Sequence, residues 1–439
     1  MNIGLFTDTY YPQVNGVATS VLMLKENLEK LGHNVYVFTT TDPNASKDES
    51  NVFRIPSIPF KSSRRVGVLY NPLVIRRIKR LKLDVIHTNT EFSLGILGRV
   101  VAREFNLPFI HTYHTIYEDY THYIVKFGAL DRIAKKTARK ISQKFCNSAD
   151  GVIVPTFKVK DLLISYSVYK PISVVPTGIS LEKYSCTKYP ISERLKIRKG
   201  LGIADDDKVL LYIGRLSEEK NIDELLYGMK SYLADKDDVR FVLVGDGPDG
   251  ERLQNYAKEL GIGDKTIFTG EKPWDEIGKY YNIGDVFINA SQSETQGLTY
   301  IEALASGLPV VAKADRCLEG VVENGSNGYM YHSLEELFKI LDSVLYDNYH
   351  MKMLKNAAVK SVEKYSAMGF AIKLEAEYKK VLNRKRRYSR ASWRMDSWPN
   401  TIYNKNWCSL SLGLRLKAKR KRFLLALYLP IIAKNIILR

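Results

Sequence analysis

The chain has 439 residues, 45% of them hydrophobic, and is long enough to bury two cores. Its four cysteines, Cys146, Cys186, Cys317 and Cys408, are too scattered to suggest a disulfide framework or a zinc site, and they fit a reducing cytoplasm. No uninterrupted apolar stretch reaches the roughly 18 residues of a membrane-spanning helix, and the opening residues MNIGLFTDTYYP are typical of a strand rather than a signal peptide.

Short apolar runs alternate with helical patterns from residue 2 to residue 156, and the same alternation starts again at KVLLYIGR (208–215). Strand, helix and strand repeated in this way predict parallel sheets with helical crossovers. We therefore predict an α/β protein with a first domain over 1–178 and a second over 179–365. A helix over 366–382 is expected to close the second domain. In such sheets ligands bind beyond the carboxyl ends of the strands, so the cleft between the domains is the expected site.

The net charge of +18 is concentrated in a predicted tail over 383–439, which holds fifteen Lys and Arg against one acidic residue. The tail also contains three of the four tryptophans, Trp393, Trp398 and Trp407. Its apolar run FLLALYLPIIA is too short to span a bilayer and is interrupted by Pro430, which favours a position in a membrane interface. Basic segments with aromatic residues also bind single-stranded nucleic acid, which is the rival partner.

Two further basic clusters lie in the first half of the chain. Residues 127–145 have the pattern of an amphipathic helix, and residues 61–82 are also rich in Lys and Arg. A solvated face explains either cluster alone, but together with the tail they favour an anionic partner surface. The tryptophans and the apolar run favour a membrane over nucleic acid.

Two loops that follow predicted strands carry residues suited to a phosphate ligand. GRLSEEKN (214–221) places Arg215 and Lys220 where two cations can hold a diphosphate, although solvated charges explain the loop too. GDGPDG (245–250) contains Gly245 and Gly247 between a strand and a helix, so its backbone amides can approach an anionic or nucleotide ligand. A tight turn explains the same spacing.

The segment SETQGLTYIEALASG (293–307) adds carboxylates to this set. Glu294 lies in a predicted loop, Gly297 opens a helix, and Glu302 follows on that helix after seven intervening residues. The helix N-terminus offers amides to a phosphate, and the two carboxylates can accept hydrogen bonds from a sugar and a ribose. Each glutamate alone is equally typical of a helix cap or a surface residue.

Taken in order, PQVNGVATS (12–20), GRLSEEK, VGDGP and the two glutamates resemble glycosyltransferase family 4, a family of retaining enzymes with the GT-B fold. The resemblance covers roughly residues 1–382. It implies that Arg215 and Lys220 bind the donor diphosphate and stabilise it as it leaves. It also implies that Glu294 holds sugar hydroxyls and Glu302 binds the ribose.

The same resemblance assigns backbone roles at the donor. Gly297 and Leu298 would present amides, and Gly16 would allow close approach to the donor phosphate. Gln296 stands where phenylalanine is common in the family, so contacts with the donor sugar are expected to differ there.

Retaining enzymes of this family are thought to react on one face of the sugar, with the departing diphosphate helping to deprotonate the acceptor. Catalysis then consists mainly of positioning and stabilisation of the leaving group. A double displacement would need a carboxylate nucleophile, which the sequence does not locate.

No metal site and no tightly bound cofactor are predicted, and Asp205, Asp206 and Asp207 are read as a solvated turn. Stimulation by Mg²⁺ is left open.

TYHTIYEDYTHYI (112–124) closely resembles a segment of bacterial 1,2-diacylglycerol 3-α-glucosyltransferases, a branch of the family that acts at membrane surfaces. The resemblance implies transfer of glucose from UDP-glucose to the 3-hydroxyl of diacylglycerol by a peripheral protein on the cytoplasmic face of the membrane. Addition of a second sugar to a glycosyl-diacylglycerol is the alternative. A non-catalytic protein that binds membranes or nucleic acid is the alternative of another class. The sequence does not separate glucose from galactose, and it leaves the oligomeric state open.

Within this segment His114 matches a family position beside the donor sugar, which implies sugar positioning and transition-state support rather than general base chemistry. Tyr113, Tyr117 and Tyr120 are predicted to line the acceptor pocket. Glu118 and Asp119 are acceptor-side candidates, and a cap of the following helix explains them equally well.

Overall fold

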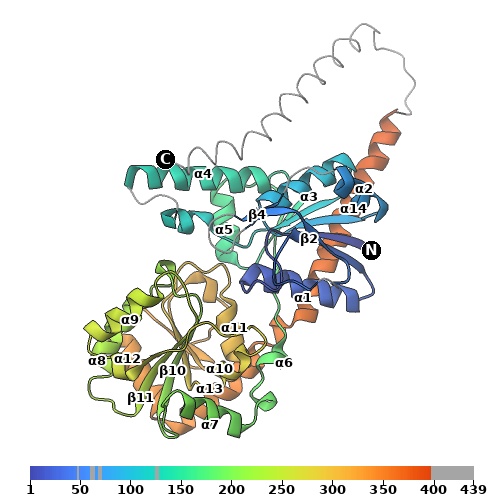
Figure 1. The fold of residues 1–439 in the computed structure, drawn as a ribbon. Coiled ribbons are helices and arrows are strands. Elements are labelled where there is room, and N and C mark those ends of the chain that lie inside the picture. Colours follow the sequence, from blue (N-terminus) through green and yellow to red (C-terminus); the bar gives the residue numbers. More distant parts are fainter. Residues whose placement is uncertain (47–48, 60–64, 68–71, 124–127, 397–439) are drawn as a thin grey trace.

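The computed structural model describes residues 1–46, 49–59, 65–67, 72–123 and 128–396, which form two α/β domains and a long last helix. Figure 1 shows the first domain above the second, with the last helix, coloured orange to red, running up along the first domain. Residues 397–439 lie outside the described residues, and with them Trp398, Trp407 and the apolar run of the predicted tail. No helix of the described part is long and apolar enough to cross a membrane.

The described part of the first domain contains a seven-stranded sheet with the order β3-β2-β1-β6-β7-β8-β9, and its neighbouring strands are parallel. A short antiparallel pair, β4 and β5, lies beside it. The strands are β1 (Asn2–Phe6), β2 (Asn34–Thr40), β3 (Val52–Ile55), β4 (Ser57–Pro59), β5 (Arg65–Gly67), β6 (Val85–Thr88), β7 (Phe109–Thr112), β8 (Gly151–Val154) and β9 (Ile172–Val174). The helices are α1 (Gly16–Lys30), α2 (Pro72–Arg80), α3 (Ser93–Glu104), α4 (Gly128–Cys146) and α5 (Phe157–Ser165), with a 3₁₀ segment η1 (Tyr117–Tyr123).

The second domain contains a six-stranded parallel sheet, within the described residues, with the order β12-β11-β10-β13-β14-β15. Its strands are β10 (Lys208–Ile213), β11 (Val239–Val244), β12 (Thr266–Phe268), β13 (Val286–Asn289), β14 (Val310–Lys313) and β15 (Gly328–Tyr331). The helices that connect and cover them are α6 (Leu181–Tyr184), α7 (Ile191–Gly200), α8 (Ile222–Tyr232), α9 (Gly250–Glu259), α10 (Ile277–Tyr281), α11 (Leu298–Ala305), α12 (Leu334–Leu345) and α13 (Asn348–Ser361). Short 3₁₀ segments include η3 (Glu218–Lys220) and η5 (Arg316–Leu318).

Both faces of each main sheet are buried by helices, which explains why the strands read as nearly continuous apolar runs. Along β10, Val209 and Leu211 belong to one core, while Leu210 and Tyr212 belong to the core on the opposite face. Successive side chains of a strand point to opposite faces, so these four residues of β10 each have an apolar environment.

The last helix, α14 (Ala367–Asp396), corrects two predictions. It does not close the second domain, because Phe370, Leu374 and Tyr378 are buried in the first-domain core beside β1, β2 and α1. The helix also continues beyond residue 382, so the predicted boundary at 383 falls inside it. The Lys385 ammonium donates to the Leu107 carbonyl at 2.6 Å, which attaches the start of the predicted tail to the first domain.

Within the described residues the chain therefore crosses between the domains twice, and the two crossings lie side by side. Ile179 on the outward crossing forms a β-bridge with Ser366 on the return. The Ile179 amide donates to the Tyr365 carbonyl at 2.9 Å, and the Ala367 amide donates to the Ile179 carbonyl at 3.0 Å. This paired crossing forms the backbone connection between the two domains.

We predict that Leu374→Ala destabilises the first domain. Leu374 is fully buried, and removal of a buried leucine side chain costs about 2–5 kcal/mol of unfolding free energy. Urea unfolding followed by hydrogen exchange measures the loss and locates it. Faster exchange in β1 and α1, with the second-domain sheet unaffected, is expected, and loss of protection confined to the second domain would contradict the packing of α14 described above.

Candidate active site

The segments that follow the carboxyl ends of strands in the two sheets contact one another. The Thr156 hydroxyl, after β8, donates to the Thr295 carbonyl, after β13, at 2.8 Å. The Thr295 hydroxyl donates in turn to the His114 carbonyl, after β7, at 2.9 Å. The strand ends that were predicted to face each other across the domains therefore do meet, as expected for parallel sheets that share a site.

Lys220 and Glu294 form an ion pair between two loops of the second domain. Lys220 ends η3 after β10, Glu294 follows β13, and the ammonium lies 2.5 Å from the carboxylate Oε1. Burial by itself would lower the pKa of Lys220, but the Glu294 carboxylate together with Tyr120 and Tyr212 opposes it, and the pKa is raised. The lysine therefore stays charged, as a ligand for a diphosphate must. The structure brings together these two residues, predicted from separate motifs.

Gly297 forms the N-cap of α11 and has a left-handed backbone, with φ of 71°. A Cβ atom at this position would also lie 2.3 Å from a ring carbon of Tyr300, so both the backbone and the packing require glycine. Leu298 begins the helix, and its Cδ1 lies 3.7 Å from where a Cβ of Gly16 would be. Gly16 is the first residue of α1, so the two predicted donor-binding backbones face each other across the domains.

Glu302 is held by two tyrosines that the sequence did not indicate. Tyr184 and Tyr281 donate hydrogen bonds to its two carboxylate oxygens at 2.8 and 2.7 Å. Burial raises the pKa of Glu302, while both tyrosine hydroxyls act in the opposite direction. Nearby Lys183 is 8% exposed, and burial lowers its pKa to about 7 although Glu302 opposes this shift. The ribose-binding role of Glu302 stays a prediction, now with its carboxylate oriented by the two tyrosines.

Close packing requires glycine at positions 245 and 247, which the sequence did not reveal. A Cβ on Gly245 would lie 2.0 Å from the Gly214 carbonyl oxygen, and one on Gly247 would lie 2.2 Å from the Leu216 carbonyl oxygen. The glycines therefore let the 245–250 loop lie against the loop that carries Arg215, which is exposed. Their approach to a ligand stays a prediction.

On the first-domain side, two of the predicted acceptor residues have contacts that the sequence did not foresee. Tyr113 is fully buried in the core, with its hydroxyl 3.2 Å from that of Ser142, so the prediction that it lines a pocket is wrong. The Tyr117 hydroxyl donates to the carboxylate of Glu91, which is 5% exposed. The Tyr117 hydroxyl is therefore engaged in an internal hydrogen bond in this structure.

The acidic pair after Tyr117 divides in the same way. Arg139 of α4 donates to one carboxylate oxygen of Glu118 at 2.5 Å, and the Tyr166 hydroxyl donates to the other. Glu118 therefore ties η1 to α4 and α5, which is a structural role in place of the expected acceptor contact. Asp119 is half-buried, and its pKa is raised by burial and by neighbouring Glu118. Asp119 stays an acceptor-side candidate.

Tyr120 lies within electrostatic range of the Lys220–Glu294 pair. It lies on η1 of the first domain, and its pKa is raised by burial, with Lys220 opposing and Glu294 supporting that shift. A tyrosine of the first domain is therefore close enough to sense both charges of the second-domain ion pair.

His114 is partly buried, and its Nε2 lies 3.1 Å from the Asn89 side-chain oxygen. An amide oxygen only accepts, so this contact places the proton on Nε2 and leaves Nδ1 as an acceptor. Burial, reinforced by His111, lowers the pKa of His114 to about 3. A neutral imidazole with so low a pKa is a weak base, which agrees with a positioning role.

Two further residues join the domains at the 291–297 loop. The sequence marked Gln296 only as a departure from the family pattern, and it did not mark Lys158. Gln296 is 3% exposed, and its side-chain amide accepts from the Thr177 amide at 2.8 Å and donates to the Thr177 carbonyl at 2.9 Å. The departure from the family's phenylalanine therefore fixes the loop to the interdomain crossing. Lys158 of α5 binds the same loop from the first domain.

Within the described residues no group of three or more His, Cys, Asp or Glu side chains is placed to hold a metal ion. The acidic turn at 205–207 is only partly solvated, because Asp207 is 7% exposed and accepts from the Ala204 amide at 3.0 Å. Its carboxylate closes the turn that precedes β10.

The low pKa of His114 predicts a pH dependence of stability. The unfolded chain binds a proton at this residue near pH 6.5 and the folded chain only near pH 3, so the free energy of unfolding should fall as pH decreases through that window. His114→Gln keeps a donor for Asn89 and does not titrate. Urea unfolding at pH 7 and pH 5 should show a shallower decline for this variant, and the exposed His332→Gln serves as control. A decline as steep as that of the wild type would contradict the assignment.

Comparison with known proteins agrees with this geometry. The family model described as Glycosyltransferase Family 4 matches residues 14–183, and the model described as Glycosyl transferases group 1 matches residues 193–361. An alpha-monoglucosyldiacylglycerol synthase of Streptococcus pneumoniae is 45% identical over 340 residues, covering 77% of this chain and 76% of the relative. A protein of the same name from Acholeplasma laidlawii is 36% identical over 393 residues, covering 88% of this chain and 98% of the relative.

Solved structures show the same fold. Anabaena Alr3699/HepE in complex with UDP has a TM-score of 0.69 at 19% identity and covers 87% of this chain and 100% of its own. Sucrose-phosphate synthase from Thermosynechococcus elongatus has a TM-score of 0.68 at 22% identity, covering 87% and 99%. The predicted GT-B architecture of the two domains is thereby confirmed. With family models matching both domains and relatives matching most of the chain, this protein belongs to glycosyltransferase family 4 and is a glycosyltransferase.

Proposed function

We propose that this glycosyltransferase transfers glucose from UDP-glucose to the 3-hydroxyl of 1,2-diacylglycerol with retention of configuration, giving α-monoglucosyl-diacylglycerol. The observation that carries the proposal is the identity of 45% and 36% to two proteins named alpha-monoglucosyldiacylglycerol synthase, one of which is matched over 98% of its length. The Lys220–Glu294 pair and the oriented Glu302 support catalysis over a purely binding role.

The donor side of the proposal rests on the second domain. Solved relatives in fold include complexes of Anabaena Alr3699/HepE with UDP and with UDP-glucose. In this chain Arg215 and Lys220 would neutralise the diphosphate as it leaves, and Glu302 would accept from the ribose hydroxyls. Glu294 has one oxygen engaged by Lys220, and it would hold hydroxyls of the sugar with its remaining acceptor capacity.

The proposed chemistry is mainly electrostatic. Negative charge develops on the diphosphate oxygen when the bond to the anomeric carbon breaks, and the charged Lys220 stabilises it. The proton of the acceptor hydroxyl passes to the departing diphosphate on the same face of the sugar. His114 contributes by position, because an imidazole with a pKa of about 3 does not remove that proton efficiently.

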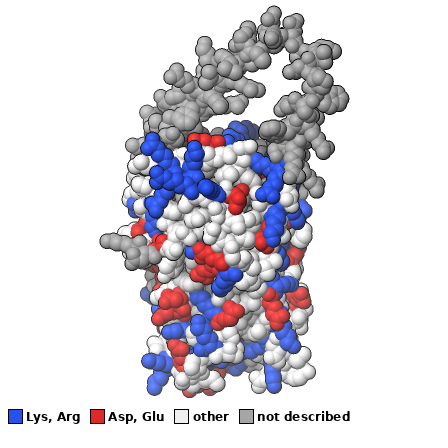
Figure 2. Space-filling model, turned by 90° about the vertical axis from the view of Figure 1, so that its right-hand side faces the viewer, with Lys and Arg blue, Asp and Glu red and all other residues white. Residues whose placement is uncertain are grey.

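The acceptor is a membrane lipid, and the first domain carries features suited to an anionic surface. Helix α4 exposes Leu130, Ile133 and Ile141 at 57%, 62% and 48%. The same helix also exposes basic residues: Arg132, Lys136, Arg139, Lys140 and Lys144. On the face that Figure 2 shows, Lys and Arg side chains gather toward the first-domain end, while both charges alternate over the second domain. We propose a peripheral protein on the cytoplasmic face of the membrane, where each nearby basic residue contributes about 1 kcal/mol.

The proposal is tested by incubating the full chain with UDP-glucose and 1,2-diacylglycerol in mixed micelles, with and without anionic lipid. Formation of α-monoglucosyl-diacylglycerol supports it, and no glycolipid under any condition refutes it. UDP-galactose as a second donor and monoglucosyl-diacylglycerol as a second acceptor separate the neighbouring reactions. Binding of single-stranded DNA without UDP release would favour the non-catalytic alternative.

We predict that Lys220→Ala and Glu294→Ala each lower kcat/KM by about 100-fold or more, because loss of one preorganised charge at a reacting group has this effect. The matched control is Lys208→Ala, which breaks a second-domain ion pair with Asp238, 3.0 Å long, at the opposite end of β10. Circular dichroism and urea unfolding should stay close to wild type for all three. Turnover near wild type in either site variant would remove that residue from the donor site.

We also predict that truncation after Asp396, which keeps all of α14, weakens binding to anionic liposomes by about tenfold or more. The deletion removes nine Lys and Arg, each worth about 1 kcal/mol near an anionic bilayer. Activity on a soluble short-chain diacylglycerol should change much less. Sedimentation with anionic and neutral liposomes measures the binding, and equal losses of binding and soluble activity would show that the deleted residues support folding instead.

A further inference from the structure

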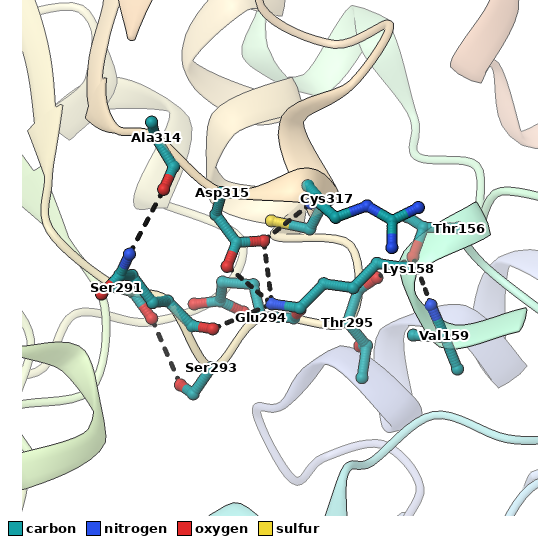
Figure 3. A network of polar contacts seen from close by, with 12 residues as sticks. Thr156, Lys158, Val159, Ser291, Ser293, Glu294, Thr295, Ala314, Asp315 and Cys317 are labelled. Atoms are coloured by element: carbon teal, nitrogen blue, oxygen red, sulfur yellow. Dashed lines mark hydrogen bonds and ion pairs between the residues drawn. The ribbon is translucent and has the colours of Figure 1, made fainter. Parts of the chain in front are cut away.

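Lys158 of α5 reaches from the first domain into the donor loop of the second. Its ammonium donates to the carbonyl oxygens of Gln292 at 2.8 Å and of Glu294 at 3.2 Å. It also contacts both carboxylate oxygens of Asp315, at 2.8 and 2.7 Å. Figure 3 shows this arrangement, with the lysine side chain lying between the 291–295 loop and Asp315.

The carboxylate of Asp315 is held by its own domain, independently of Lys158. One Asp315 oxygen accepts from the Cys317 amide at 2.7 Å, which caps η5 after β14. The side chains of Asp315 and Lys158 are 8% and 19% exposed, so water screens the pair less than a surface ion pair. The ammonium therefore has a defined position, set by the second domain, from which it binds the loop carbonyls.

The residue that Lys158 holds by its main chain is the one that holds Lys220 by its side chain. Glu294 presents its carbonyl to Lys158 and its carboxylate to Lys220. The next residue, Thr295, is held by the Thr156 hydroxyl and itself donates to the His114 carbonyl. A shift of the 294–295 peptide would therefore move Glu294 relative to both Lys220 and His114.

We infer that Lys158 is a positioning residue that couples contact between the domains to the alignment of Glu294. The second domain alone supplies Arg215, Lys220 and the carboxylate of Glu294, but the Lys158 and Thr156 bonds to the 292–295 main chain come from the first domain. The second domain thus contains both cations that would hold the diphosphate. The placement of Glu294 at the sugar, in contrast, depends on both domains. This inference rests on the donor-binding role of Glu294 in the proposed function.

The chain offers a matched control on the same helix. Arg316 donates to the Asp161 carboxylate at 2.8 Å, which also joins α5 to the segment after β14. The side chains of this pair are 57% and 53% exposed. Arg316 also donates to Glu319, and within the described part of the chain it makes no hydrogen bond to a carbonyl of the 291–297 loop. A general loss of adhesion between the domains should therefore appear in Asp161→Asn as well as in Lys158→Met.

The experiment compares full-length wild type, Lys158→Met, Lys158→Arg and Asp161→Asn in the micelle assay with UDP-glucose and diacylglycerol. We expect Lys158→Met to lower kcat by about 10- to 100-fold, because small misplacements in a catalytic site have effects of this size. The Kd for UDP, measured by calorimetry, should stay within about threefold of wild type, a change below 1 kcal/mol. Asp161→Asn should keep kcat near wild type, and Lys158→Arg, which retains the charge, should recover part of it.

Hydrogen exchange gives a readout that does not depend on the substrate. The amides of 291–297 should exchange faster in Lys158→Met than in wild type or Asp161→Asn. Equal kinetic effects in Lys158→Met and Asp161→Asn, a fall of UDP affinity as large as that of kcat, or unchanged exchange in this loop would each overturn the inference. If the wild type makes no glucosyl-diacylglycerol, the proposed function fails, and the exchange comparison still decides whether Lys158 orders the loop.

Discussion

The 291–297 segment is the part of the structure on which both domains act. It follows β13 in the second domain and leaves the sheet, so its carbonyl groups need partners other than a neighbouring strand. Lys158 and Thr156 of the first domain supply two of these partners, and Gln296 fixes the end of the segment to Thr177. The side chain of Glu294 then faces Lys220. The hydrogen bonds that satisfy the carbonyl groups of this segment therefore also position Glu294 in the proposed donor site.

The paired crossing joins the two separately packed domains beside this segment. The return crossing continues directly into α14, which packs on the first domain instead of the second. Tyr378 of this helix shares a hydrogen bond of 2.7 Å with His87 of β6, in the middle of the sheet. The basic sequence that follows therefore starts from a helix anchored to the acceptor-side domain. Helix α4 belongs to the same domain, so α4 and the described start of that basic sequence are both attached to the first domain.

The crowded polar stretch at 112–123 is largely an internal network. Glu91 accepts from Tyr117 and lies 3.0 Å from His111 Nε2, while Glu118 binds Arg139 and Tyr166. Buried polar groups require partners, and these side chains supply them to one another. The network fixes η1 between the sheet and α4, and η1 presents Tyr120 beside the charges of Lys220 and Glu294. More residues of the stretch are engaged in internal hydrogen bonds than its composition suggests.

Much of the proposed donor site could be predicted from the sequence, because its chemistry depends on short motifs at strand ends. The alternation of apolar runs determined two parallel sheets, and the loops after their strands placed Lys220, Glu294 and Gly297 at one edge. The acceptor side was less predictable, since Tyr113 and Glu118 have the residue types of a binding site but face the core and α4. Lys158 looked like any solvated lysine of a surface helix, and residues 366–382 carried only a helical period. Local patterns record which residues are apolar and how often they recur. They do not record which distant surface an element packs against, and that was decided by tertiary packing: α14 belongs to the first domain, Gln296 binds the crossing, and Lys158 binds the loop of the opposite domain.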